Sequence, residues 1–227
     1  MRSRVQMEAD HLRRRVEEGD PFWPAQLAVG IAIALNLPLS GKLTIGPNWL
    51  LPVVEGALLI ALVTSLPSRG NRPHAGHRLF AMSVVGLVTL VNIVSIGLLV
   101  HYLLGHHAHV QGRPLIASGA VLLATNILLF AVWFWEFDRG GPVSRFMNPD
   151  VLPDFQFPQM ENPQLAPKAW RPGFLDYLYL SLTNATAFSP TDTMPLTQSA
   201  KILMSLQSVT SLITIALVVA RAVNILS

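Results

Sequence analysis

The stretch LIASGAVLLATNILLFAVWFWEF, residues 115–137, holds a single charged side chain, that of Glu136. At about 1.5 Å of rise per residue, a helix of this length crosses the roughly 30 Å hydrocarbon core of a bilayer. Apolar runs of spanning length also cover residues 22–40, 49–66, 79–104 and 198–226. We therefore expect an all-α integral membrane protein with five transmembrane helices.

The composition is typical of a membrane protein. Hydrophobic residues make up 51% of the 227 residues and charged residues 13%, about half the charged share of a soluble domain. The chain has no cysteine, which excludes disulfides, a thiol nucleophile and thiolate metal ligands. The net charge of +3 fits the basic loops that membrane topology requires, so we expect no nucleic-acid partner. No catalytic motif is visible, and we predict no enzyme activity, no cofactor and no metal.

Polarity divides the chain into four regions. Residues 1–21 form a polar N-terminal segment, and residues 22–137 form a region of four membrane helices. Residues 138–172 hold seven prolines without helical periodicity, so we predict an extended, mostly non-helical loop. Residues 173–227 contain a short apolar segment, a polar turn and the final membrane helix. The aromatic cluster of residues 130–135 suits a belt at the membrane interface.

The basic residues set the orientation. If the spans alternate, 13 of the 16 Lys and Arg residues lie on the side of the N-terminus, and only Lys42, Arg113 and Arg221 lie on the other side. Basic loops face the cytoplasm, which places the N-terminus and the Pro-rich loop there and the C-terminus outside.

The segment FLDYLYLSLTNATAF, residues 174–188, is too short to span. As a helix it reaches about 22 Å, and Pro190 and Pro195 prevent a simple continuation into the last helix. We expect a re-entrant half-helix that enters the membrane and turns back, with an interfacial surface helix as the alternative. Irregular backbone at membrane depth must be buried in protein or line a wet cavity.

Oxygen-bearing side chains gather in this half-helix, in the turn after it and along the final helix. Such groups suit hard cations or water, although they also cap helices and join neighbouring ones, as Thr197 does if it caps the last helix. The candidates for lining a pore or binding a cation are Thr183, Asn184, Thr186, Ser189, Thr191, Asp192, Gln207, Ser211 and Thr214.

Two further groups of polar residues have competing interpretations. Glu55 is an acid inside a predicted span, which suggests a proton or cation relay, but it lies close enough to Trp49 to reach the interface. The histidines of HHAH, residues 106–109, fit an exposed loop better than a metal site.

The polar turn resembles the pore module of tetrameric cation channels, whose fingerprint is T-x-G-Y-G-D-x-x-P. In TAFSPTDTMP, Thr186, Asp192 and Pro195 match the Thr, Asp and Pro of that family, with one extra residue between Thr and Asp. Both filter glycines and the tyrosine are missing, and the turn is predicted on the cytoplasmic side. The resemblance therefore implies a degenerate pore loop and no potassium selectivity of that kind.

The whole chain also resembles uncharacterised bacterial multi-pass membrane proteins, through FWEFDRGGP, DFQFPQM and DYLYLSLTNATAFSPTDTMPLT. This resemblance implies the bacterial cell (inner) membrane and no particular activity. The first hypothesis is a channel-like homo-oligomer with a degenerate pore loop that passes a monovalent or divalent cation. The alternative is a non-conducting membrane scaffold that binds a partner through its Pro-rich loop.

Overall fold

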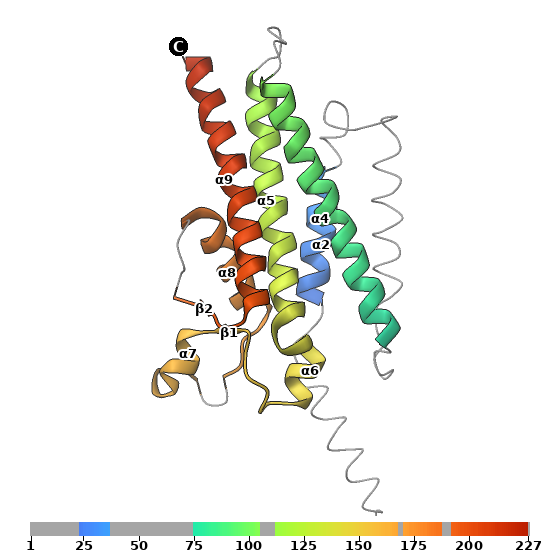
Figure 1. Cartoon of the computed structure of the whole chain (residues 1–227), viewed down its shortest axis with the longest axis vertical. Coiled ribbons are helices and arrows are strands. Elements are labelled where there is room, and N and C mark those ends of the chain that lie inside the picture. The colour runs from blue at the N-terminus through green and yellow to red at the C-terminus, as the bar shows by residue number, and fades with distance from the viewer. Residues whose placement is uncertain (1–22, 37–74, 105–111, 168–169, 188–191, 227) are drawn as a thin grey trace, which may run out of the picture.

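The computed structural model describes residues 23–36, 75–104, 112–167, 170–187 and 192–226. In chain order its elements are α2 (Trp23–Asn36), α4 (Ala75–Leu104), α5 (Gly112–Phe137), η2 (Asp138–Gly140), α6 (Pro142–Met147), β1 (Phe155–Gln156), α7 (Pro158–Glu161), η3 (Pro163–Leu165), α8 (Phe174–Ala187), β2 (Met194–Pro195) and α9 (Gln198–Leu226). The described chain is mostly helical, as predicted (Figure 1).

The long helices follow the apolar runs closely. α9 begins and ends where the hydropathy places it, α4 and α5 each begin a few residues earlier than predicted, and α2 covers only part of the run 22–40. The predicted span 49–66, with Glu55, lies outside the described residues.

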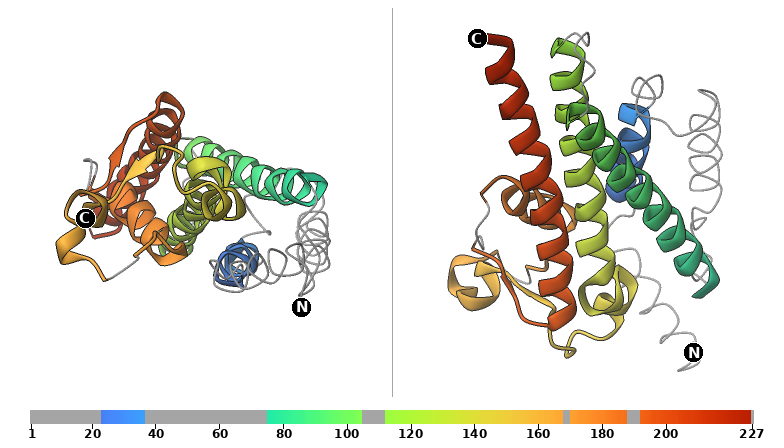
Figure 2. Two further views of the ribbon diagram at one scale, coloured as in Figure 1. Left: turned by 90° about the horizontal axis from the view of Figure 1, so that it is seen from below. Right: turned by 45° about the horizontal axis from the view of Figure 1, so that its top comes forward.

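α5 occupies the centre of the bundle and packs against α2, α4, α8 and α9. α4 and α9 run in one direction and α5 in the other, with the short elements of the Pro-rich segment at the end where α9 begins (Figures 1 and 2). Small residues allow close packing on one side. Ala25, Ala28 and Ala32 of α2 are buried in the core cluster that contains Leu129 and Phe130 of α5.

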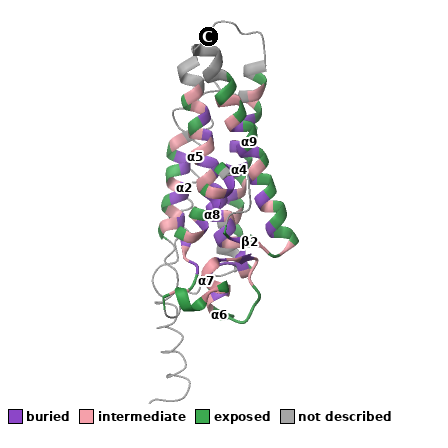
Figure 3. Ribbon diagram, turned by 90° about the vertical axis from the view of Figure 1, so that its left-hand side faces the viewer, coloured by how far each residue is buried: buried purple, intermediate pink, exposed green. Residues whose placement is uncertain are grey.

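Among the described residues, two helices are long and apolar enough to cross a membrane, Ile116–Met147 and Gln198–Ala220. The distribution of polarity agrees with a lipid environment. Large apolar side chains such as Leu90, Leu206 and Leu212 are exposed, whereas the amides of Asn92 and Gln207 are buried between helices (Figure 3). In a bilayer, polar groups face protein or water because exposure to hydrocarbon is costly.

The Pro-rich segment is more regular than the loop predicted for it. Its prolines do not prevent α6 and α7, because Pro142 and Pro158 stand at the start of these helices, where no backbone donor is needed. β1 pairs antiparallel with β2, with Phe155 opposite Pro195. The segment is therefore fastened to the chain just before α9.

The aromatic cluster at the end of α5 is buried, so its assignment to an interfacial belt was wrong. Phe134 and Trp135 are 0% and 2% exposed. The ring centroids of Phe134 and Phe155 lie 5.2 Å apart, and those of Trp135 and Phe174 lie 6.0 Å apart. The rings are enclosed because β1 and the start of α8 fold over the end of α5.

Candidate functional site

α8 begins and ends without crossing the bundle. It starts beside the end of α5, and the chain then comes back to β2 at the same end before α9 begins (Figure 1). Asn184, near the end of α8, lies beside Gln207 in the third turn of α9.

The threonine hydroxyls among the predicted residues of α8 bond to their own helix. Thr183 Oγ1 donates to the carbonyl oxygen of Tyr179 at 2.8 Å, and Thr186 Oγ1 donates to that of Leu182 at 2.8 Å. Asp192 is exposed. Ser189 and Thr191 lie outside the described residues. Where they can be located, the hydroxyls of the predicted site are thus not gathered around one point.

An amide network joins α8 to α9 and α5. Asn184 Nδ2 donates to Gln207 Oε1 at 2.7 Å, and Gln207 Nε2 donates to Ser181 Oγ at 2.6 Å. Ser181 Oγ in turn donates to the carbonyl oxygen of Ile127 at 2.7 Å. Asn184 and Gln207 are 4% and 0% exposed, so these bonds replace contacts with water or lipid.

The polar line of α9 continues inside the bundle. Thr214 Oγ1 donates to the carbonyl oxygen of Thr210 at 2.7 Å, and Thr210 Oγ1 accepts from Asn126 Nδ2 at 2.7 Å. Ser211 Oγ, Thr125 Oγ1 and Asn126 Oδ1 are buried and have no hydrogen-bond partner within the described part of the chain. The predicted pore stripe of Gln207, Ser211 and Thr214 therefore faces neighbouring helices of the same chain.

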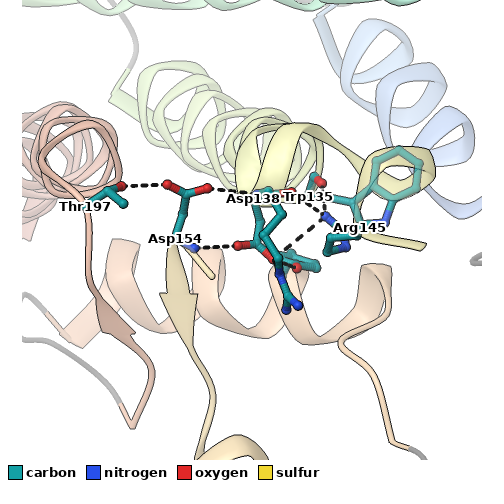
Figure 4. A network of polar contacts seen from close by, with 7 residues as sticks. Trp135, Asp138, Arg145, Asp154 and Thr197 are labelled. Atoms are coloured by element: carbon teal, nitrogen blue, oxygen red, sulfur yellow. Dashed lines mark hydrogen bonds and ion pairs between the residues drawn. The ribbon is translucent and has the colours of Figure 1, made fainter. Parts of the chain in front are cut away.

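A second polar cluster, unrelated to the predicted residues, lies at the end of α5 (Figure 4). Asp138 is fully buried, and its Oδ2 accepts from the Tyr177 hydroxyl at 2.6 Å. Arg145 Nη1 donates to the carbonyl oxygens of Trp135 and Asp138 at 2.6 and 3.1 Å, and lies 3.9 Å from Asp138 Oδ2. The guanidinium of Arg145 also sits over the ring of Tyr177, 5.0 Å from its centroid.

Burial raises the pKa of Tyr177 far above its usual value, and the Asp138 carboxylate adds to this against the opposing charge of Arg145. The phenol therefore stays protonated and remains a donor to Asp138. Asp138 in turn supplies the negative charge that a buried guanidinium needs.

The turn DRGGP positions Asp138. Arg139, Gly140 and Gly141 have φ values of 53°, 76° and 96°. Glycine adopts such values without strain, so Gly140 and Gly141 suit this turn. The sharp reversal places Arg145 of α6 back against the end of α5.

Asp154 extends this cluster to α9. Its backbone N–H donates to Asp138 Oδ1 at 2.8 Å, its Oδ2 accepts from the Arg139 N–H at 2.8 Å, and its Oδ1 accepts from Thr197 Oγ1 at 2.7 Å. Thr197 Oγ1 also accepts from the N–H of Ala200 at 3.2 Å. Thr197 is therefore the N-cap of α9, as predicted.

Residues of the Pro-rich segment line an open hollow of about 870 Å³ beside this cluster. Its charged lining residues are Arg139, Arg145, Arg171 and Asp150. Prolines and the side chains of Phe146, Met160 and Trp170 form most of the rest. Within the described ranges, no group of three His, Asp or Glu side chains could hold a metal ion.

No family model, curated protein or solved structure matches the chain. The residues that line the hollow and those of the buried polar cluster beside it were not among the predicted site residues. The interpretation of the sequence that pointed to this region was the alternative in which the Pro-rich loop binds a partner.

Proposed function

We propose that the chain is a multi-pass membrane protein that binds a ligand in its Pro-rich segment and does not conduct ions. The observation that carries this proposal is the hollow in the Pro-rich segment, together with the buried polar cluster beside it. A volume of about 870 Å³ lies within the range of small-molecule sites. Arg145 lines the hollow, and its contacts with Asp138 and Tyr177, which lie behind the lining, fix the position of its guanidinium before any ligand arrives.

In this proposal the chain crosses a bacterial cell membrane five times, with α8 as a re-entrant half-helix. The N-terminus and the hollow then lie on the cytoplasmic side and the C-terminus outside, which the distribution of basic residues supports. The bilayer is the first partner of the protein, through the apolar faces of α4 and α9.

The route of α8 supports a second candidate, a channel-like homo-oligomer that passes a cation. A half-helix followed by a polar turn and a long helix is also the arrangement of a pore module. Against it, the polar side chains Gln207, Ser211 and Thr214 are each 0% exposed in the single chain, while the outward face of α9 is apolar. A pore between subunits would need polar groups on that outward face.

Native mass spectrometry of the gently extracted protein tests the binding function. We expect a bound small molecule that is lost in Ala166→Trp, because a tryptophan at this lining position fills the hollow. Ala117→Trp, on an exposed face of α5, is the control and should retain the molecule. The binding function is excluded if the filled variant and the control give the same spectrum.

Ion flux in liposomes separates the two candidates. The binding function predicts no flux with either wild-type protein or Asp192→Ala. A cation flux that Asp192→Ala reduces would instead support the channel-like candidate and place the permeation path at the turn after α8.

A further inference from the structure

We propose that the hollow binds the phosphate group of a ligand that also carries hydroxyl groups. This inference rests on the ligand-binding function proposed above and names the class of ligand. Three of its four charged lining residues are arginines. Guanidinium groups recognise phosphate through parallel N–H donors, with charge assistance that a neutral ligand cannot supply.

Arg139 carries the argument furthest. Its side chain is only 12% exposed, and Nε makes a long contact of 3.4 Å with Asp138 Oδ2. Its Nη2 is buried and has no hydrogen-bond partner among the residues that the structure describes. A buried donor of a charged group without a partner is costly, so a shift of the Arg139 side chain that brought Nη2 to an anion in the hollow would be favourable.

On the lining itself, three arginines stand against one acid. Beneath the lining, Asp138 contacts both Arg139 and Arg145, and the carboxylate of Asp154 accepts the backbone N–H of Arg139. Asp150 is the acid on the lining itself, and it is exposed. Arg171 stands at the exposed rim with its guanidinium 5.0 Å from the centroid of the Phe146 ring, which holds its charge beside the opening.

Gln159 indicates what accompanies the phosphate. Gln159 lines the hollow, and its Oε1 is a buried acceptor without a partner in the described part of the chain. A rotation of the amide would bring this acceptor to a ligand hydroxyl. Trp170 and the prolines offer an apolar wall for the remainder of the molecule. An anionic lipid headgroup with glycerol hydroxyls and a soluble sugar phosphate share this chemistry.

Thermal unfolding of the full chain in maltoside micelles tests the inference. The probes are inorganic phosphate against chloride at equal ionic strength, and phosphatidylglycerol against diacylglycerol, which has the same tails without phosphate. We expect phosphate-bearing probes alone to raise the unfolding temperature. An effect of inorganic phosphate indicates a soluble phosphate ester, and an effect of phosphatidylglycerol alone indicates a lipid headgroup.

Arg171→Gln and Arg139→Lys should weaken the affinity at least about tenfold, because each removes a charged fork from the anion. Arg171 lies at the rim, so its variant keeps the buried polar cluster intact. Lys201→Gln, an exposed basic residue at the same end but not in the lining, is the matched control and should not change the affinity.

The inference is overturned if neither phosphate probe stabilises the protein, or if Arg171→Gln responds as Lys201→Gln does. A bound molecule that contains no phosphorus, yet is displaced by Ala166→Trp, would leave the binding function standing and refute the phosphate assignment. If native mass spectrometry finds no bound molecule that is lost in Ala166→Trp, both the binding function and the phosphate assignment are refuted.

Discussion

At the scale of the residue, Asp138 combines more constraints than any predicted site residue. Its carboxylate receives the Tyr177 hydroxyl and the Asp154 N–H, and it lies within ion-pair distance of Arg139 and Arg145. A carboxylate in so buried a position persists because each lone pair has a donor and the arginines balance its charge.

Asp138→Asn should lower the free energy of unfolding by about 3–5 kcal/mol, because the amide keeps the size but leaves buried guanidinium groups without a counter-charge. Denaturant unfolding in micelles measures the loss. Asp150→Asn makes the same chemical change at an exposed position of the same segment and should stay within about 0.5 kcal/mol of wild type. Equal effects of the two variants would show that the buried charges are not stabilising.

At the scale of the element, the side-chain amides of Asn184 and Gln207 join α8 to α9, and the hydroxyl of Thr197 caps the start of α9. Gln207→Leu removes the acceptor of Asn184 and the donor to Ser181, and should cost about 1–3 kcal/mol of unfolding free energy. Ser211→Ala is the matched comparison on the same face of α9. It removes a buried hydroxyl without a partner in the described chain, so it should be neutral or stabilising. A larger loss for Ser211→Ala would mean that Ser211 has an essential partner.

The cap of α9 gives a separate prediction. Thr197→Val preserves shape but loses both the Ala200 bond and the Asp154 bond, and should cost about 1–2 kcal/mol. Thr197→Ser restores the hydroxyl and should recover most of the loss. Thermal unfolding followed by circular dichroism compares the two variants. Equal stability of the Val and Ser variants would argue against the cap.

The sequence was sufficient to predict what depends on neighbouring residues. Hydropathy predicted α5 and α9, and local chemistry predicted the cap at Thr197. It could not predict contacts between distant residues. The Tyr177 bond to Asp138 spans 39 residues, and no periodicity relates the two. The aromatic residues of α5 were misjudged for the same reason, since Phe155 and Phe174 cover them from other segments.

At the scale of the whole molecule, topology is the property to measure. Tags at residues 1 and 227 should lie on opposite sides of the membrane if five spans and a half-helix are correct. The chain lacks cysteine, so Leu152→Cys supplies a single exposed thiol at the hollow. A membrane-impermeant maleimide should label it in inverted vesicles and not in intact cells. Both termini on one side, or labelling of intact cells, would contradict the proposed orientation.

Asp154 has a mechanical consequence for the whole molecule. One of its carboxylate oxygens holds the first residue before α9, and the other holds the backbone of Arg139 at the edge of the hollow. A displacement of α9 along its axis would therefore strain the hydrogen bond between Thr197 and Asp154 and shift the backbone of Arg139. A rearrangement around Arg139 would be transmitted to α9 by the same two bonds. Movements of α9 and of the hollow are therefore coupled mechanically through Asp154.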